Sequence, residues 1–92
     1  MNYKNKYSKP NFGTETLTRI KRWPSLKEKW KNSQVRIWSG EHEAYWGENS
    51  RGYTEQGLKA GVYSFEEAYA ITKHCCDKKK IMYVLHGGLK ND

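Results

Sequence analysis

Three stretches of the chain carry a regular pattern of hydrophobic and polar side chains, and each predicts one element. Residues 34–39 (QVRIWS) alternate, with Val35 and Ile37 on one face, as the side chains of a half-buried strand do. Residues 65–75 place apolar side chains at a spacing of 3.6 residues, which predicts an amphipathic helix. Residues 81–86 (IMYVLH) are apolar on both faces, so we expect this strand in the middle of a sheet.

Two serine residues predict where helices begin. Ser64 and Glu67 form the pattern of a capping box, in which each side chain hydrogen-bonds the backbone N–H of the other residue. Ser25 and Glu28 repeat this pattern. The predicted helices are a main one from Ser64 to about Cys76 and a short one over residues 26–31.

Shorter segments complete the predicted domain. Residues 43–46 pair back on the first strand as a hairpin, and Tyr53-Thr54 forms a third, very short strand. Residues 17–23 fit a short strand or a helical turn equally well. This order predicts an α+β fold, in which one main helix packs on a small three- or four-stranded, mainly antiparallel sheet, with a short N-terminal helix beside it.

The charge of the chain is concentrated at one end. Residues 1–32 hold nine Lys and Arg against two acids, whereas residues 33–92 hold eight of each, so the net charge of +7 comes from the first third. Residues 1–16 lack apolar periodicity and carry Pro, Gly and several Asn. We interpret them as a basic, flexible arm ahead of a single domain over residues 17–92, with a core built largely from aromatic rings.

Several classes of protein are disfavoured by composition. No apolar run approaches the roughly 18–20 residues that span a bilayer, and the N-terminus lacks the apolar segment of a secretory signal. The two cysteines are adjacent and do not form the spaced framework of a small secreted fold. We therefore expect a cytoplasmic protein with no membrane partner.

A glycine-flanked loop is the first candidate site for a ligand or partner. Backbone N–H groups beside its glycines can face an anion, an arginine fork suits a phosphate, and a ring can stack on a base. The alternative is a tight connection whose glycines permit positive φ and whose rings belong to the core. The candidate residues are Trp46, Asn49, Ser50, Arg51, Tyr53 and Thr54.

A basic segment interleaved with tryptophans is the second candidate, for binding a polyanion. Lys and Arg neutralise phosphates, and Trp23 and Trp30 can stack on bases. The alternative is a solvated basic face over two core tryptophans. No motif for sequence-specific readout accompanies it, so weak, sequence-independent binding is expected. The candidate cations are Arg19, Lys21, Arg22, Lys27, Lys29 and Lys31.

Two further clusters resemble fragments of catalytic or metal sites. Glu41, His42 and Glu43 lack an accompanying nucleophile or second base and read more simply as a solvated turn. Cys75 and Cys76 are adjacent, whereas structural zinc sites space their cysteines by two to four residues. We expect no enzyme activity, no cofactor and no metal site.

One pattern resembles a known group of proteins. The motifs IWS-x-EH, GYT and AG-x-Y-S-x-x-EA, which fall within residues 35–72, are similar to a group of small hypothetical proteins from phages and prophages. The resemblance implies a phage-like origin and a compact domain, and it carries no assigned chemistry.

These observations support two hypotheses of function. The first is a phage-encoded binding protein that inhibits or sequesters a host factor, most simply a component of antiviral defence (a protein, a nucleoprotein or a signalling nucleotide), in the host cytoplasm. The alternative is an accessory protein that binds nucleic acid through its basic N-terminal arm. An enzyme built around Glu41 and His42 is a third reading, and it lacks the residues that catalysis requires.

Overall fold

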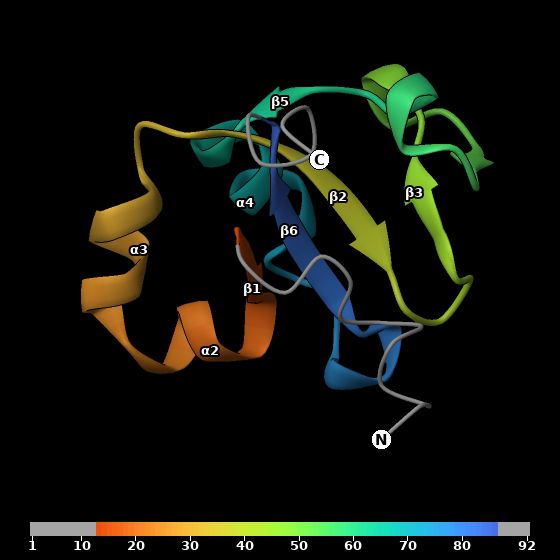
Figure 1. The fold of residues 1–92 in the computed structure, drawn as a ribbon. Helices are drawn as coiled ribbons and strands as arrows, with labels where there is room; N and C mark the ends of the chain where they lie inside the picture. Colours follow the sequence, from red (N-terminus) through yellow and green to blue (C-terminus); the bar gives the residue numbers. More distant parts are fainter. Residues whose placement is uncertain (1–12, 87–92) are drawn as a thin grey trace.

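The computed structural model describes residues 13–86, which form one antiparallel β-sheet with helices packed against it (Figure 1). The rest of the predicted arm and residues 87–92 lie outside the described residues. In chain order the elements are β1 (Thr14–Thr16), α2 (Leu17–Arg22), α3 (Pro24–Trp30), β2 (Gln34–Ser39), β3 (Ala44–Trp46), a 3-10 turn (Glu48–Ser50), β4 (Tyr53–Thr54), a second 3-10 turn (Gly57–Lys59), β5 (Tyr63–Ser64), α4 (Phe65–Thr72), a third 3-10 turn (Asp77–Lys79) and β6 (Ile81–Leu85).

Strands β2 and β6 form the centre of the sheet. The strand order is β1-β6-β2-β3-β4, and β5 also pairs with β2. One edge of β2 therefore serves two partners, because Gln34 and Val35 pair with β5 while Trp38 and Ser39 pair with β3. The central position expected for residues 81–86 is confirmed, since β6 lies between β1 and β2.

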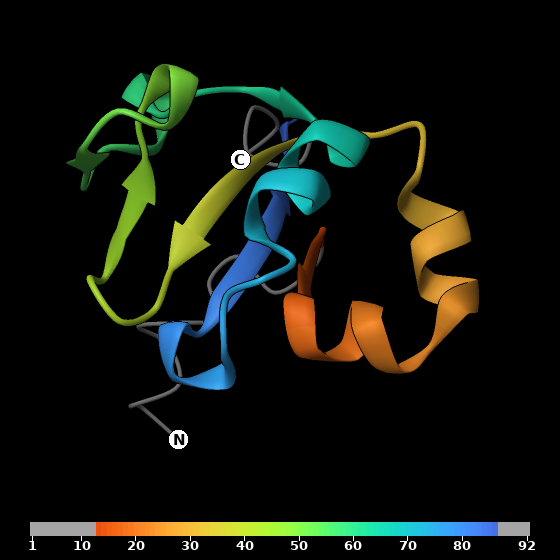
Figure 2. The same ribbon diagram turned by 180° about the vertical axis from the view of Figure 1, so that it is seen from behind.

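The strand predicted for residues 34–39 is confirmed, and Val35 and Ile37 share its buried face, but the strand is not half-buried, because Arg36 on the other face is also buried and Trp38 is only partly exposed. Val35 and Ile37 are fully buried in the main core together with Phe65 of α4, and Figure 2 shows α4 lying across this face of the sheet. Tyr83 packs edge-on against Phe65 with ring centroids 5.2 Å apart, and its hydroxyl lies 2.8 Å from Thr72 Oγ1. The opposite face carries a smaller cluster of Trp38, Tyr45, Ala60 and Val84.

The start of the main helix is confirmed and its end is corrected. Ser64 Oγ accepts a hydrogen bond from Glu67 N at 3.1 Å, which satisfies one of the free N–H groups of the first turn. The helix ends at Thr72, four residues earlier than predicted. Cys75 N donates to Thr72 O at 2.8 Å, so the chain closes a tight turn there instead of continuing the helix.

The cap predicted at Ser25 is wrong. Trp23 occupies the N-cap of α3 with an extended backbone and no side-chain hydrogen bond, and Ser25 lies inside the helix. Pro24 takes the first helical position, where its fixed φ suits the helix and its missing N–H has no partner to lose. The proline, one residue before Ser25, therefore sets the start of this helix.

Strand β1 corrects the boundary drawn for the arm. Its three residues pair with β6, and Leu85 N donates to Gly13 O at 2.7 Å, so residues 13–16 belong to the sheet. The undecided segment 17–23 is mostly helix α2, capped by Thr16, whose Oγ1 accepts from Arg19 N. The α+β class is confirmed, with six strands and three α-helices over residues 13–86 in place of the smaller sheet and two helices predicted.

Candidate functional site

Helices α2 and α3 carry the whole set of cations that the sequence singled out for polyanion binding. The two helices are consecutive and pack against each other, and residues 13–32 hold six cations against two acids. The structure therefore gathers the predicted set on one helical pair. All six side chains are exposed: Arg19, Lys21 and Arg22 on α2, Lys27 and Lys29 on α3, and Lys31 at its C-cap.

Trp23 lies near two of these six cations. It joins α2 to α3, and 46% of its surface is exposed. The guanidinium carbon of Arg19 lies 5.2 Å from the indole centroid and that of Arg22 lies 5.5 Å from it. Arg19 is also held by Glu15, with Nε 3.1 Å from the carboxylate oxygen. An exposed indole thus orients two guanidinium groups at the corner between the helices.

Trp30 does not belong to this surface. Its exposed fraction is 7%, and its ring lies 6.1 Å from that of Phe65 in the main core. The two tryptophans of the basic segment therefore differ, since Trp23 is exposed with two arginines over its ring and Trp30 is a core residue.

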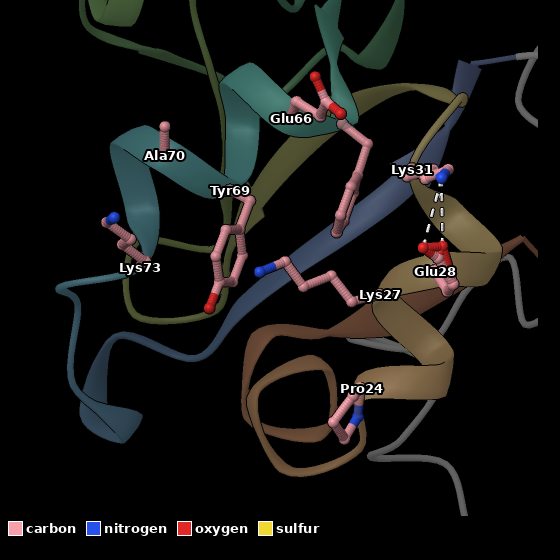
Figure 3. Close-up of a pocket in the computed structure, with 9 residues that line it drawn as sticks. Pro24, Lys27, Glu28, Lys31, Glu66, Tyr69, Ala70 and Lys73 are labelled. Atoms are coloured by element: carbon pink, nitrogen blue, oxygen red, sulfur yellow. Dashed lines mark hydrogen bonds and ion pairs between the residues drawn. The ribbon is translucent and has the colours of Figure 1, made fainter.

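A groove separates α3 from α4 and begins at Pro24, the residue after Trp23 (Figure 3). Its volume is about 660 Å³. Lys27 reaches across it from α3, and its Nζ lies 4.4 Å from the centroid of the Tyr69 ring on α4. Lys31 is paired with Glu28 at 3.2 Å on one side of the groove. The lining residues are Pro24, Lys27, Glu28, Lys31, Phe65, Glu66, Tyr69, Ala70 and Lys73.

Sequence reasoning missed the α4 side of this groove. Tyr69 belongs to the apolar face predicted for residues 65–75, and its ring does pack against the main core beside Phe65, but it also lines the groove. Lys73 has no predicted role. Their spacing of four residues places them on one side of a helix, which is a signal that the sequence carries. The sequence does not indicate that α3 lies opposite this side, because that arrangement depends on tertiary packing.

Three backbone N–H groups of the loop between β3 and β4 donate hydrogen bonds within the protein. Ser50 N donates to the hydroxyl of Tyr63 at 3.0 Å, and that hydroxyl donates to the carbonyl of Gly47. Gly47 N donates to Gly52 O at 2.9 Å, and Arg51 N donates to Glu48 O at 3.0 Å. These three N–H groups bond within the protein and are therefore not directed at an anion. Of the two flanking glycines, Gly52 has the positive φ expected for a tight connection and Gly47 does not.

The side chains of the loop candidates point to different environments. Trp46 is half-buried and packs against the main core, and Thr54 Oγ1 accepts from Gln56 N within its own turn. The Tyr53 ring, 52% exposed, stacks on His42 with centroids 4.2 Å apart. The three remaining candidates are exposed on the turn: Asn49 and Ser50, both with left-handed backbone, and Arg51.

The acidic hairpin turn is engaged with its neighbours. Lys79 Nζ lies 3.2 Å from Glu41 Oε1, and His42 Nε2 lies 3.7 Å from the same oxygen.

Cys75 is a half-buried free thiol and Cys76 an exposed one, and burial raises the pKa of the Cys75 thiol. Across residues 13–86, no three His, Cys, Asp or Glu side chains gather in a way that could hold a metal ion.

Arg36 is a buried cation on β2. Its exposed fraction is 4%, and burial lowers its pKa. Nε donates to Gly57 O at 2.7 Å, and one terminal nitrogen lies 2.8 Å from His86 Nδ1. These contacts tie β2 to the turn before β5 and to the end of β6, so we assign Arg36 a structural role.

No described helix is both long enough and apolar enough to cross a membrane. Searches against protein families, curated proteins and solved structures gave no match to this chain.

Proposed function

We propose that this protein is a binding protein, without catalytic activity, that holds the phosphate backbone of single-stranded nucleic acid on helices α2 and α3. The observation that carries the proposal is the exposed indole of Trp23 with Arg19 and Arg22 against it. Proteins that bind single strands without sequence preference combine a basic track for the backbone with aromatic rings on which bases stack.

The arrangement around Trp23 suits this task for two physical reasons. A guanidinium group that rests on an indole is held in place before the ligand arrives, so less side-chain entropy is lost when it binds a phosphate. The lysines of α3 extend the positive surface from this corner, and every phosphate that they neutralise releases condensed counterions. The groups expected for an enzyme are engaged elsewhere, since Glu41 pairs with Lys79 and His42 stacks on Tyr53.

The test is the affinity of the full chain for a fluorescent twelve-residue oligothymidine, measured by anisotropy at low salt. Trp23→Ala should weaken binding about fivefold or more, because stacking of one base contributes about 1–3 kcal/mol, and Trp23→Phe should restore part of the loss. Lys59→Ala, an exposed position on the turn before β5, serves as a control that should change little. Equal affinities for Trp23→Ala and the wild type would refute the proposal.

A second proposed function is inhibition of a host antiviral defence component by a phage-encoded protein in the host cytoplasm. The observation that favours it is the loop between β3 and β4, where a locked backbone presents Asn49, Arg51 and Tyr53 at the surface. Tyr and Arg are frequent anchors of protein interfaces, and a preformed loop loses little entropy on binding.

This second proposal is tested by phage plating on a defended bacterial strain that expresses the chain. Expression should raise plating efficiency, and Arg51→Ala and Tyr53→Ala should abolish the effect while Trp23→Ala preserves it. Plating that is unchanged by the wild-type chain, in a panel of strains with different defence systems, would argue against inhibition.

A further inference from the structure

We infer that the groove between α3 and α4 holds one nucleotide of the bound strand, with its phosphate on Lys27 and its base against the ring of Tyr69. This inference rests on the proposed binding of single-stranded nucleic acid and specifies where one unit of the strand lies. Pro24 lines the groove and directly follows Trp23 in the chain, so the groove lies near the ring on which the strand is proposed to stack.

The size of the groove fits such an occupant. Sites for small ligands have volumes of about 300–1,000 Å³, and this groove has about 660 Å³. Figure 3 shows Lys27 projecting into the space from α3 toward Tyr69, with Lys73 on the α4 side. A lysine chain alone does not fill a space of this volume.

The contact between Lys27 and Tyr69 indicates how a nucleotide enters. The Lys27 ammonium lies 4.4 Å from the ring centroid in the structure. A cation–π contact at an exposed site is weaker than a charged hydrogen bond to a phosphate and weaker than a base stacked on a ring. A nucleotide supplies both stronger contacts, because its phosphate draws the ammonium away and its base takes the vacated place over Tyr69.

The acidic residues of the groove favour a nucleotide over an acidic protein segment. Glu28 and Glu66 lie on the same lining as the three lysines. The two carboxylates repel a phosphate and an acidic side chain alike, but a base edge can donate a hydrogen bond to them, through N3–H of thymine or an exocyclic amino group, whereas an ionised acidic side chain has no donor. The mixture of cations, acceptors and two rings, Phe65 and Tyr69, matches the mixed chemistry of a nucleotide.

The test compares two lysines of one helix that differ in their relation to the groove. Lys27 lines it, whereas Lys29 lies outside its lining, and both are exposed. The full chain is titrated at low salt with labelled oligothymidine and with an abasic oligomer of the same length. Lys27→Ala should weaken binding of both probes about tenfold, while Lys29→Ala should weaken it about twofold as the loss of one unspecific charge.

The ring is tested separately from the charge. Tyr69→Leu should weaken binding of oligothymidine about fivefold or more and leave the abasic oligomer unaffected, and Tyr69→Phe should bind as the wild type does. Equal losses for Lys27→Ala and Lys29→Ala would overturn the groove site while the proposed function stands. Absence of wild-type binding to oligothymidine would overturn both. A third outcome would assign the groove to an acidic protein segment instead of a nucleotide. In that outcome polyglutamate binds, Lys27→Ala weakens its binding to the same extent, and Tyr69→Leu has no effect.

Discussion

The hydroxyl of Tyr63 links strand β5 to the loop between β3 and β4. It accepts a hydrogen bond from Ser50 N at 3.0 Å and donates one to Gly47 O. The ring is 4% exposed and belongs to the main core. Tyr63→Phe keeps this ring and removes only the oxygen, so it leaves one backbone N–H and one carbonyl of the loop without their partner.

The expected cost follows from these two contacts. A net hydrogen bond contributes about 0.5–1.5 kcal/mol, and a buried group left unsatisfied costs more. Both contacts of Tyr63 are partly buried, so we expect a loss of about 1–2 kcal/mol in the free energy of unfolding. For a domain of this size, each kcal/mol lowers the melting temperature by about 4–8 °C.

Thermal unfolding and amide hydrogen exchange measure the two consequences. The melting temperature should fall by about 5–15 °C, and exchange at Ser50 N should accelerate more than exchange in β6. Tyr53→Phe is the matched control, because Tyr53 lies at the end of the same loop and is 52% exposed. An unchanged melting temperature with full protection of Ser50 N would show that the hydroxyl does not hold the loop.

Three further predictions concern stability and reactivity. Ser64→Ala should cost about 0.5–2 kcal/mol in chemical denaturation, whereas Ser25→Ala should cost little because Ser25 is not a cap; equal costs would contradict the assigned caps. Cys76, which is exposed, should be alkylated by iodoacetamide before Cys75, because the raised pKa of Cys75 lowers its thiolate fraction and its half-buried position limits access. Mass spectrometry after short reaction times measures the order, and faster alkylation of Cys75 would contradict this prediction. Burial raises the pKa of Tyr83 above its ordinary value of about 10. The folded state therefore holds this proton more tightly than the unfolded state, so stability should fall as pH rises above about 10, and Tyr83→Phe should show a smaller fall.

The parts of the fold that the sequence predicted are those set by local pattern. The alternation of residues 34–39, the two-sided apolar run of β6 and the cap at Ser64 each depend on neighbours within one element. The error at Ser25 arose because a capping-box pattern and a proline at N1 compete for the same helix start, and Pro24 determined it. Strand β1 was missed because Thr14–Thr16 has no apolar periodicity and is held by pairing with β6.

The candidate sites also differ in how far the sequence could predict them, depending on whether their residues are close together in the chain. The six cations could be grouped from the sequence because they lie close together in the chain, and they are exposed on two consecutive helices and the C-cap of the second. The hydrogen bond of Ser50 N could not be foreseen, since its acceptor is the hydroxyl of Tyr63, which lies thirteen residues after Ser50. The groove also joins distant segments, with Lys27 on α3 and Tyr69 on α4, and no pattern within either helix indicates that they meet.

The salt dependence of oligothymidine binding tests the central claim most directly. Each phosphate contact on a single strand lowers the slope of log K against log salt by about 0.7. Four to six contacts from α2 and α3 give a slope of about −3 to −4 for the full chain, and Arg22→Ala should make it shallower by about 0.7. A slope near zero, or the same slope for Arg22→Ala and the wild type, would contradict the assignment of this surface to the phosphate backbone.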